Sequence, residues 1–135
     1  MQTISCISVL LFVVVGSAMC DLAPELQAIL KKRQDECLAS NPVDKNVLDD
    51  ARNGKFADDA KLKKYIFCNL YEGSFLTEEG VLRPQIAQIK LTLAFGKEKA
   101  ESLIEKCKPV SKGNKVDVAF DLLKCIYNDT KVPII

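Results

Sequence analysis

The feature that most constrains the fold is a set of four widely spaced cysteines: Cys37, Cys68, Cys107 and Cys125. None of them forms a Cys-x-x-Cys pair, the spacing typical of cysteine-ligated zinc sites and thioredoxin-like redox motifs. Each lies instead on the apolar side of a different predicted helix. We therefore expect two disulfides that join four helices, and four cysteines allow three pairings among which their spacing does not choose.

Residues 1–20 hold the other two of the six cysteines and no charged residue. Their apolar run, Val9 to Val15, is too short to span a bilayer and is followed by small residues, as in a secretory signal peptide. We favour cleavage after Cys20, with cleavage after Ala18 or a retained membrane anchor as the alternatives. The sequence thus predicts a signal peptide over 1–20 and one secreted, extracellular domain over 21–135, in a compartment where disulfides form.

The composition argues against most enzyme classes. The chain has no histidine, so the Ser-His-Asp and Cys-His hydrolase sites and histidine-ligated zinc are excluded. A net charge of +1 gives no reason to expect a nucleic-acid partner. Adjacent carboxylates are predicted to be solvated charges, not acid and base, at Asp49-Asp50, Asp58-Asp59 and Glu78-Glu79. We expect no catalysis, no cofactor, no metal and no stable insertion into a membrane.

Apolar residues recur at helical spacing through most of residues 21–135, and prolines, glycines and polar caps divide the pattern into about six short helices. Asp58 or Asp59 caps the third helix, Pro84 opens the fourth, and Gly96 separates the fourth from the fifth. Residues 75–83 are expected to form a loop. The predicted fold class is all-α.

With these four cysteines the chain resembles the insect odorant-binding proteins, whose members carry six. The family's second and fifth cysteines, which bond to each other, would fall at Lys64 and Val116. Because both are absent together, the chain resembles the C-minus subclass. The segment Lys-x-Tyr-Ile-Phe-Cys68 and an apolar tail after the last helix extend the likeness.

The resemblance implies the pairs Cys37–Cys68 and Cys107–Cys125, and a compact domain of about six helices around an apolar ligand cavity. Family positions and helical spacing give a candidate ligand-binding set: Ile66, Leu70, Tyr71, Ile89, Leu93, Ile104, Leu122, Ile126, Val132 and Ile134. Asn69 and Tyr127 are further polar candidates, and the tail, including Ile135, could close the cavity. The same apolar stripes could equally be ordinary core.

The function that the resemblance implies is secreted transport of small hydrophobic, volatile or semi-volatile molecules. An olfactory receptor and a weak homodimer are further candidate partners. The alternative is a secreted helical signalling or structural protein with a fully packed core that acts through protein–protein contacts. The two differ in one property, because only a protein with a cavity is stabilised by small apolar molecules.

Overall fold

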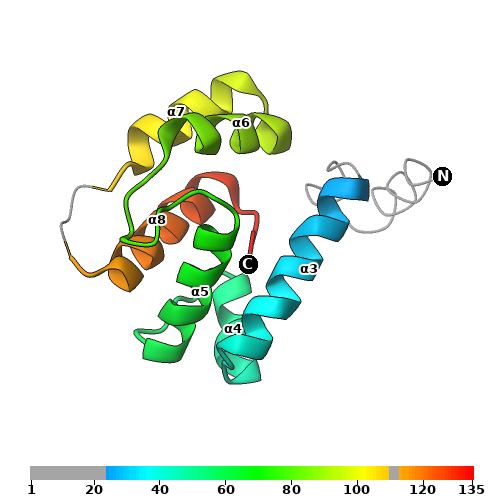
Figure 1. The fold of residues 1–135 in the computed structure, drawn as a ribbon, viewed down its shortest axis with the longest axis vertical. Coiled ribbons are helices and arrows are strands. Elements are labelled where there is room, and N and C mark those ends of the chain that lie inside the picture. The colour runs from blue at the N-terminus through cyan, green and yellow to red at the C-terminus, as the bar shows by residue number, and fades with distance from the viewer. Residues whose placement is uncertain (1–23, 110–112) are drawn as a thin grey trace.

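A computed structural model describes residues 24–109 and 113–135 of the chain. The predicted signal peptide, residues 1–20, lies outside the described residues. The described ranges form six α-helices and no strand beyond an isolated bridge between Leu76 and Leu82, which confirms the all-α prediction. The helices are α3 (Pro24–Ser40), α4 (Lys45–Arg52), α5 (Ala60–Glu72), α6 (Pro84–Phe95), α7 (Lys97–Cys107) and α8 (Lys115–Thr130) (Figure 1).

Local capping explains where the helices begin. Asp44 accepts hydrogen bonds from two backbone N–H groups in the first turn of α4, and Asn114 does the same for α8. Of the two candidate caps of α5, Asp59 accepts from the Leu62 N–H at 2.8 Å. These side chains satisfy N–H groups that have no partner within the helix. Gly96 ends α6 and precedes α7 with a φ of 90°, a left-handed conformation that favours glycine.

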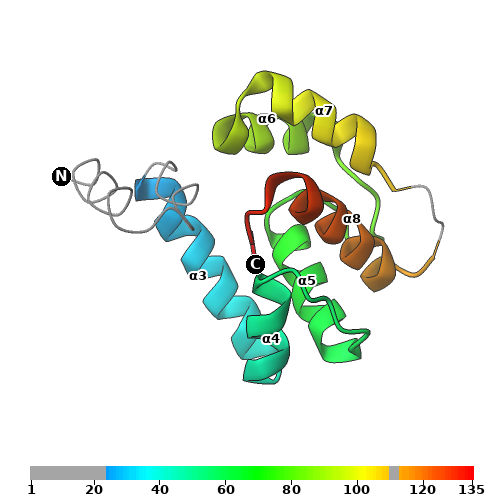
Figure 2. The ribbon, with the colours of Figure 1, turned by 180° about the vertical axis from the view of Figure 1, so that it is seen from behind.

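Helices α5 and α8 pack side by side at the centre of the molecule (Figures 1 and 2). Helix α3 lies along α5, while α6 and α7 form a hairpin whose α7 arm contacts α8. After α8 the chain turns back and ends near α4 and α5. There Arg52 of α4 donates from Nε to the backbone oxygen of Ile135 at 3.0 Å. The tail is therefore docked on the domain.

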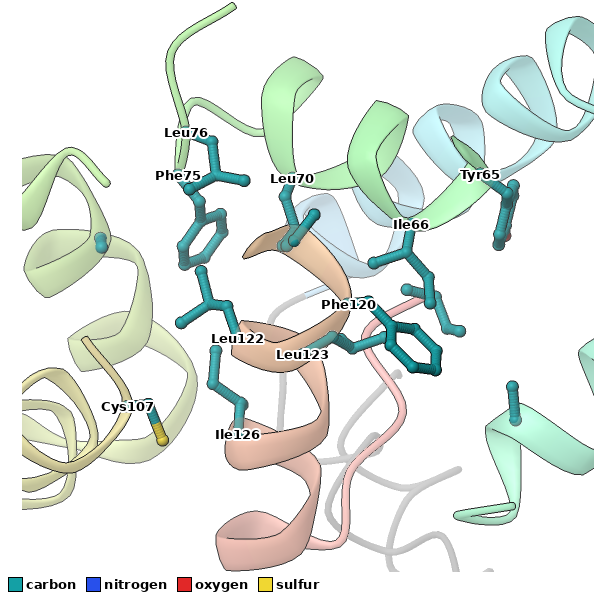
Figure 3. Packing of buried hydrophobic residues seen from close by; sticks show 14 of the residues in the cluster. Tyr65, Ile66, Leu70, Phe75, Leu76, Cys107, Phe120, Leu122, Leu123 and Ile126 are labelled. Carbon is teal, nitrogen blue, oxygen red and sulfur yellow. The ribbon is translucent and has the colours of Figure 1, made fainter. Parts of the chain in front are cut away.

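The core forms where α5 meets α8. Leu62, Tyr65 and Ile66 of α5 are fully buried, and Figure 3 shows Ile66 and Leu70 facing Leu123 and neighbouring side chains of α8. Burying a large apolar side chain contributes about 1.5–3 kcal/mol. This contact between α5 and α8 therefore contributes substantially to the stability of the fold.

Two disulfides tie outer helices to this centre within the described residues. Cys37–Cys68 joins α3 to α5 with a Cα–Cα distance of 5.7 Å, and Cys107–Cys125 joins α7 to α8 at 5.5 Å. These are the pairs that the family resemblance implies. Each closes a loop whose entropy is lost from the unfolded chain, an effect of roughly 3–4 kcal/mol for loops of this length.

The loop between α5 and α6 packs against the domain. Phe75 and Leu76 are buried, and Leu76 pairs with Leu82 across the turn. Gly80, with a φ of 88°, sits so close to α8 that an added Cβ would stand 2.8 Å from the Lys115 Cα. The loop is thus packed closely against the start of α8.

Candidate ligand pocket

A cavity of about 200 Å³ lies between α3, the end of α5, α6 and the tail. Its walls are mostly apolar, as expected of a site for a small molecule. Leu70 of α5, Leu91 of α6 and Phe75 are almost fully buried and form its inner surface. Ile29 of α3 and Leu93 of α6 also line it, yet they are 55% and 68% exposed. The mouth of the cavity therefore lies between α3 and α6.

The tail contributes part of the wall. Val132 is buried and Ile134 half-buried, and both line the cavity, while Ile135 is buried in the core cluster. The turn that brings the tail back starts at Lys131, whose φ is 59°. Thr130 holds this turn, since its hydroxyl accepts a hydrogen bond from the Val132 N–H. The tail is thus positioned by backbone geometry and by burial.

Asn69 is the buried polar side chain of the cavity wall, with 3% of its surface exposed. Its Nδ2 donates to the Tyr65 backbone oxygen at 3.0 Å, whereas its Oδ1 has no hydrogen-bond partner in the described part of the chain. Leaving a buried acceptor unpaired costs about 1–3 kcal/mol. A donor group on a ligand could recover that energy.

Two cationic side chains also line the cavity, Arg33 of α3 and Lys90 of α6. Both approach Gly73 at the end of α5. Lys90 Nζ donates to the Gly73 oxygen, and Arg33 Nη1 is 2.7 Å from the place that a Cβ on Gly73 would occupy. Burial lowers the pKa of Arg33, with partial compensation from Glu72. Burial also lowers the pKa of Lys90, and repulsion from Arg33 lowers it further.

Four residues of the predicted ligand-binding set are brought together in this cavity: Leu70, Leu93, Val132 and Ile134. They come from three separate segments of the chain. Asn69, one of the polar candidates, joins them in the cavity wall.

The other predicted residues lie elsewhere. Ile66, Leu122 and Ile126 are buried in the core, and Ile104 packs against that cluster. Figure 3 shows Ile66 facing α8, whereas Leu122 and Ile126 lie on the side of α8 toward Cys107 of α7. Ile89 is 61% exposed and lies outside the cavity wall. Their contact with a ligand stays a prediction, which would require the cavity to extend beyond its present wall.

The predicted polar contacts from tyrosine also lie apart from the cavity. Tyr71 is 38% exposed and its ring stacks on Phe67, with 5.8 Å between the ring centroids. Tyr127 meets Phe56 edge-on, with 5.7 Å between centroids. Both rings are thus engaged with other aromatic groups of the protein.

Sequence reasoning missed the contribution of α3, which supplies Leu26, Ile29, Leu30 and Arg33 to the wall. A signal was present, because these residues recur at spacings of three and four and so lie on one helical face. The same spacing connects Lys90 to the cavity-lining Ala94 on α6. A search for charged residues on the same helical face as the apolar ones would have identified both Arg33 and Lys90.

No group of three or more acidic or cysteine side chains that could hold a metal ion occurs in the described residues. Across the same ranges, no helix is long and apolar enough to cross a membrane.

The fold and cavity define a small, disulfide-linked helical domain with an internal apolar pocket. The family model of the PBP/GOBP family matches residues 21–129, and the chain therefore belongs to that family, the insect odorant-binding proteins. Members of the family are carriers of small hydrophobic ligands and not enzymes, and they are secreted.

Individual proteins of the family are similar to this chain in sequence or in fold. The chain is 30% identical to the B1 protein of Tenebrio molitor over 102 residues, 75% of this chain and 78% of the relative. The fatty acid binding protein OBP56a from the oral disk of the blowfly Phormia regina is 25% identical, with a TM-score of 0.65 over 82% of this chain and 96% of that one. Apis mellifera odorant binding protein 5 has the same fold, with a TM-score of 0.71 at 17% identity over 80% and 91% of the two chains.

Proposed function

We propose that this protein is a secreted, non-catalytic carrier that binds a small hydrophobic molecule in the cavity between α3, α5 and α6. The observation that carries the proposal is the cavity itself, about 200 Å³ of mainly apolar space. A dry, apolar protein cavity of about 150 Å³ is large enough for benzene. Compact odorant-sized molecules therefore fit, and longer chains would extend through the mouth. The blowfly relative, described as a fatty acid binding protein, supports a carrier role.

Thermal unfolding in the presence of small apolar compounds tests this proposal. A ligand that binds the folded state stabilises it, by about 2.7 kcal/mol when its concentration is a hundred times its Kd. We expect hexan-1-ol, hexanal and phenols to raise the melting temperature, with dissociation constants in the micromolar range, about 8 kcal/mol. If none of a broad set of apolar compounds raised it, the packed-core alternative would be favoured.

A substitution that fills the cavity supplies the matched control. Ala94 lines the cavity and is half-buried, so Ala94→Phe should occupy the space and abolish the ligand-induced stabilisation. Ala39 is exposed near the end of α3, outside the cavity wall, so Ala39→Phe should leave binding intact. Equal loss in both variants would contradict binding at this site.

We also propose that the tail closes the cavity. Val132 and Ile134 form part of its wall, and Arg52 holds the tail through the Ile135 backbone oxygen. Deletion of residues 132–135 should therefore speed ligand dissociation, measured by stopped-flow mixing with excess competitor. Arg52→Gln should cause a smaller acceleration. An unchanged dissociation rate in the deletion variant would refute a closing role.

The proposed export is tested by the mass of the protein recovered from the culture medium of insect cells expressing the full chain. Removal of residues 1–20 should leave Asp21 as the first residue, whereas cleavage after Ala18 would retain Met19 and Cys20. Recovery of the uncleaved chain in the membrane fraction would instead support a retained anchor.

A further inference from the structure

The polar side chains of the cavity wall indicate that its ligand is not purely apolar. Arg33 and Lys90 enter the cavity wall from opposite sides, one on α3 and one on α6. Both meet the end of α5 at Gly73, where Lys90 donates a hydrogen bond and Arg33 makes a close contact. Two like charges are therefore held near each other on apolar walls, and the resulting repulsion is one cause of the lowered pKa of Lys90.

In the described part of the chain, neither cation is neutralised at short range. The ion pairs within 4.0 Å among the described residues involve other lysines, and no carboxylate of that part of the chain pairs with Arg33 or Lys90. Glu72 acts on Arg33 only through longer-range attraction and is itself exposed. Two partly buried cations that repel each other, with no short-range carboxylate partner among the described residues, would be stabilised by an anion placed between them.

We propose that the preferred ligand of this carrier is a compact amphiphile with a carboxylate head group, which binds between Arg33 and Lys90 with its apolar part against Leu70 and Leu91. This inference rests on the proposed carrier function and specifies its ligand class. Arg33 can donate two parallel hydrogen bonds to a carboxylate, and Lys90 supplies a point charge. The negative charge would also relieve the repulsion between the two cations.

Asn69 offers a competing preference, because its unpaired Oδ1 would accept a hydrogen bond from an alcohol. Hydrogen bonds that involve a charged group are roughly twice as strong as neutral ones. A carboxylate would meet two cationic donors, whereas an alcohol would meet one neutral acceptor. We therefore expect the carboxylate to bind more tightly than an alcohol of the same chain length.

Isothermal titration calorimetry of the secreted protein at neutral pH with hexanoate, hexan-1-ol and hexanal tests the inference, since the three share one chain length. Hexanoate should bind about tenfold or more tightly than either neutral compound, a difference of about 1.4 kcal/mol. Added salt should weaken hexanoate binding and leave hexan-1-ol binding unchanged, because only the first involves an ion pair. This comparison uses the unaltered protein and does not depend on the folding of any variant.

Charge-removing variants locate the effect. Arg33→Gln and Lys90→Gln should each remove most of the preference for hexanoate over hexan-1-ol, a ratio of affinities from which a change in cavity shape common to both ligands cancels. Lys55→Gln removes the same charge from an exposed loop outside the cavity wall and should keep the preference. Circular dichroism verifies that each variant is folded.

The outcomes separate the two proposals. Equal or tighter binding of hexan-1-ol or hexanal would refute the carboxylate preference while supporting the carrier function. A similar loss in Lys55→Gln and Lys90→Gln would also refute it, because the effect would then reflect net charge. If none of the three compounds bound while other apolar compounds did, the carboxylate preference would be refuted alone. If no compound of a broad apolar set bound, the proposed carrier function would fail and this inference with it.

Discussion

The Cys37–Cys68 disulfide is expected to hold the cavity wall in place as well as stabilise the fold. Within α3, all of which the structure describes, Cys37 is the one buried residue. The same helix provides four cavity-lining residues, from Leu26 to Arg33, which are half-buried or exposed. Helix α3 thus depends on one covalent tie and a limited contact with α5. Cys107–Cys125, in contrast, joins two helices outside the cavity wall.

Loop-closure entropy gives the magnitudes. The sequence separation of 31 for Cys37–Cys68 corresponds to about 3.7 kcal/mol, and the separation of 18 for Cys107–Cys125 to about 3.2 kcal/mol. Each value is a large part of the total free energy of unfolding of such a domain, about 5–15 kcal/mol. Replacing either pair of cysteines by alanine should therefore lower the global free energy of unfolding by a similar amount. The two double variants should differ in which helices lose protection.

Native-state hydrogen exchange at low temperature measures the protection of the backbone amides in each helix. In C37A/C68A, the α3 amides should exchange nearly as freely as an unfolded segment, while α5 and α8 keep protection close to their reduced global stability. In C107A/C125A, α3 should stay as protected as the rest of the domain. Equal protection of α3 in the two variants would refute the reasoning, because α3 would then be held by its packing. Urea unfolding of both variants checks the global losses.

Gly80→Ala should destabilise the domain more than Gly96→Ala in urea unfolding; both glycines have a φ near 90°, but only at Gly80 does an added Cβ meet backbone. The backbone strain of a side chain at positive φ costs about 1–3 kcal/mol at either position, and equal losses would contradict the clash. Two lysines around Asp129 lower the pKa of its carboxyl, chiefly through a hydrogen bond, so its stabilising effect is present above about pH 4 and is lost as pH falls through the lowered pKa. Asp129→Asn should flatten the acid branch of stability, measured by urea unfolding at several pH values, and an unaltered acid branch would argue against this pairing. Lys64→Cys with Val116→Cys, on the neighbouring helices α5 and α8, should form a third disulfide under oxidising conditions, raise the melting temperature and slow ligand exchange. A melting temperature that is the same with and without reductant would show that the bond is absent or ineffective.

The helices were predictable from the sequence because each depends on contacts within a few residues. The cap at Asp59, one of the two predicted candidates, Pro84 in the first turn of α6 and the glycine at position 96 act on their own turns, and the structure has all of them in these roles. Cysteine spacing by itself left three pairings, and the family resemblance selected the pair of disulfides that the structure has.

The cavity could be predicted only in part, because it depends on how helices distant in sequence pack. Ile66 and Leu70 lie four residues apart on the same face of α5 and are equally buried, yet only Leu70 borders the cavity. Ile89 and Leu93 show the same spacing on the exposed face of α6, and only Leu93 reaches the mouth of the cavity. Periodicity identifies a face that will be covered, but not whether the opposing helix fills the space or leaves it open.

The sequence by itself determined the helical class, the helix ends and the cysteines available for cross-linking, since these follow from local spacing and caps. Only the tertiary structure decided that α3 and α6 stand apart above the end of α5, with Arg33 and Lys90 meeting at Gly73. The physical reason is that an unfilled volume and the meeting of two charges are set by packing between segments, which no single stretch of the chain encodes.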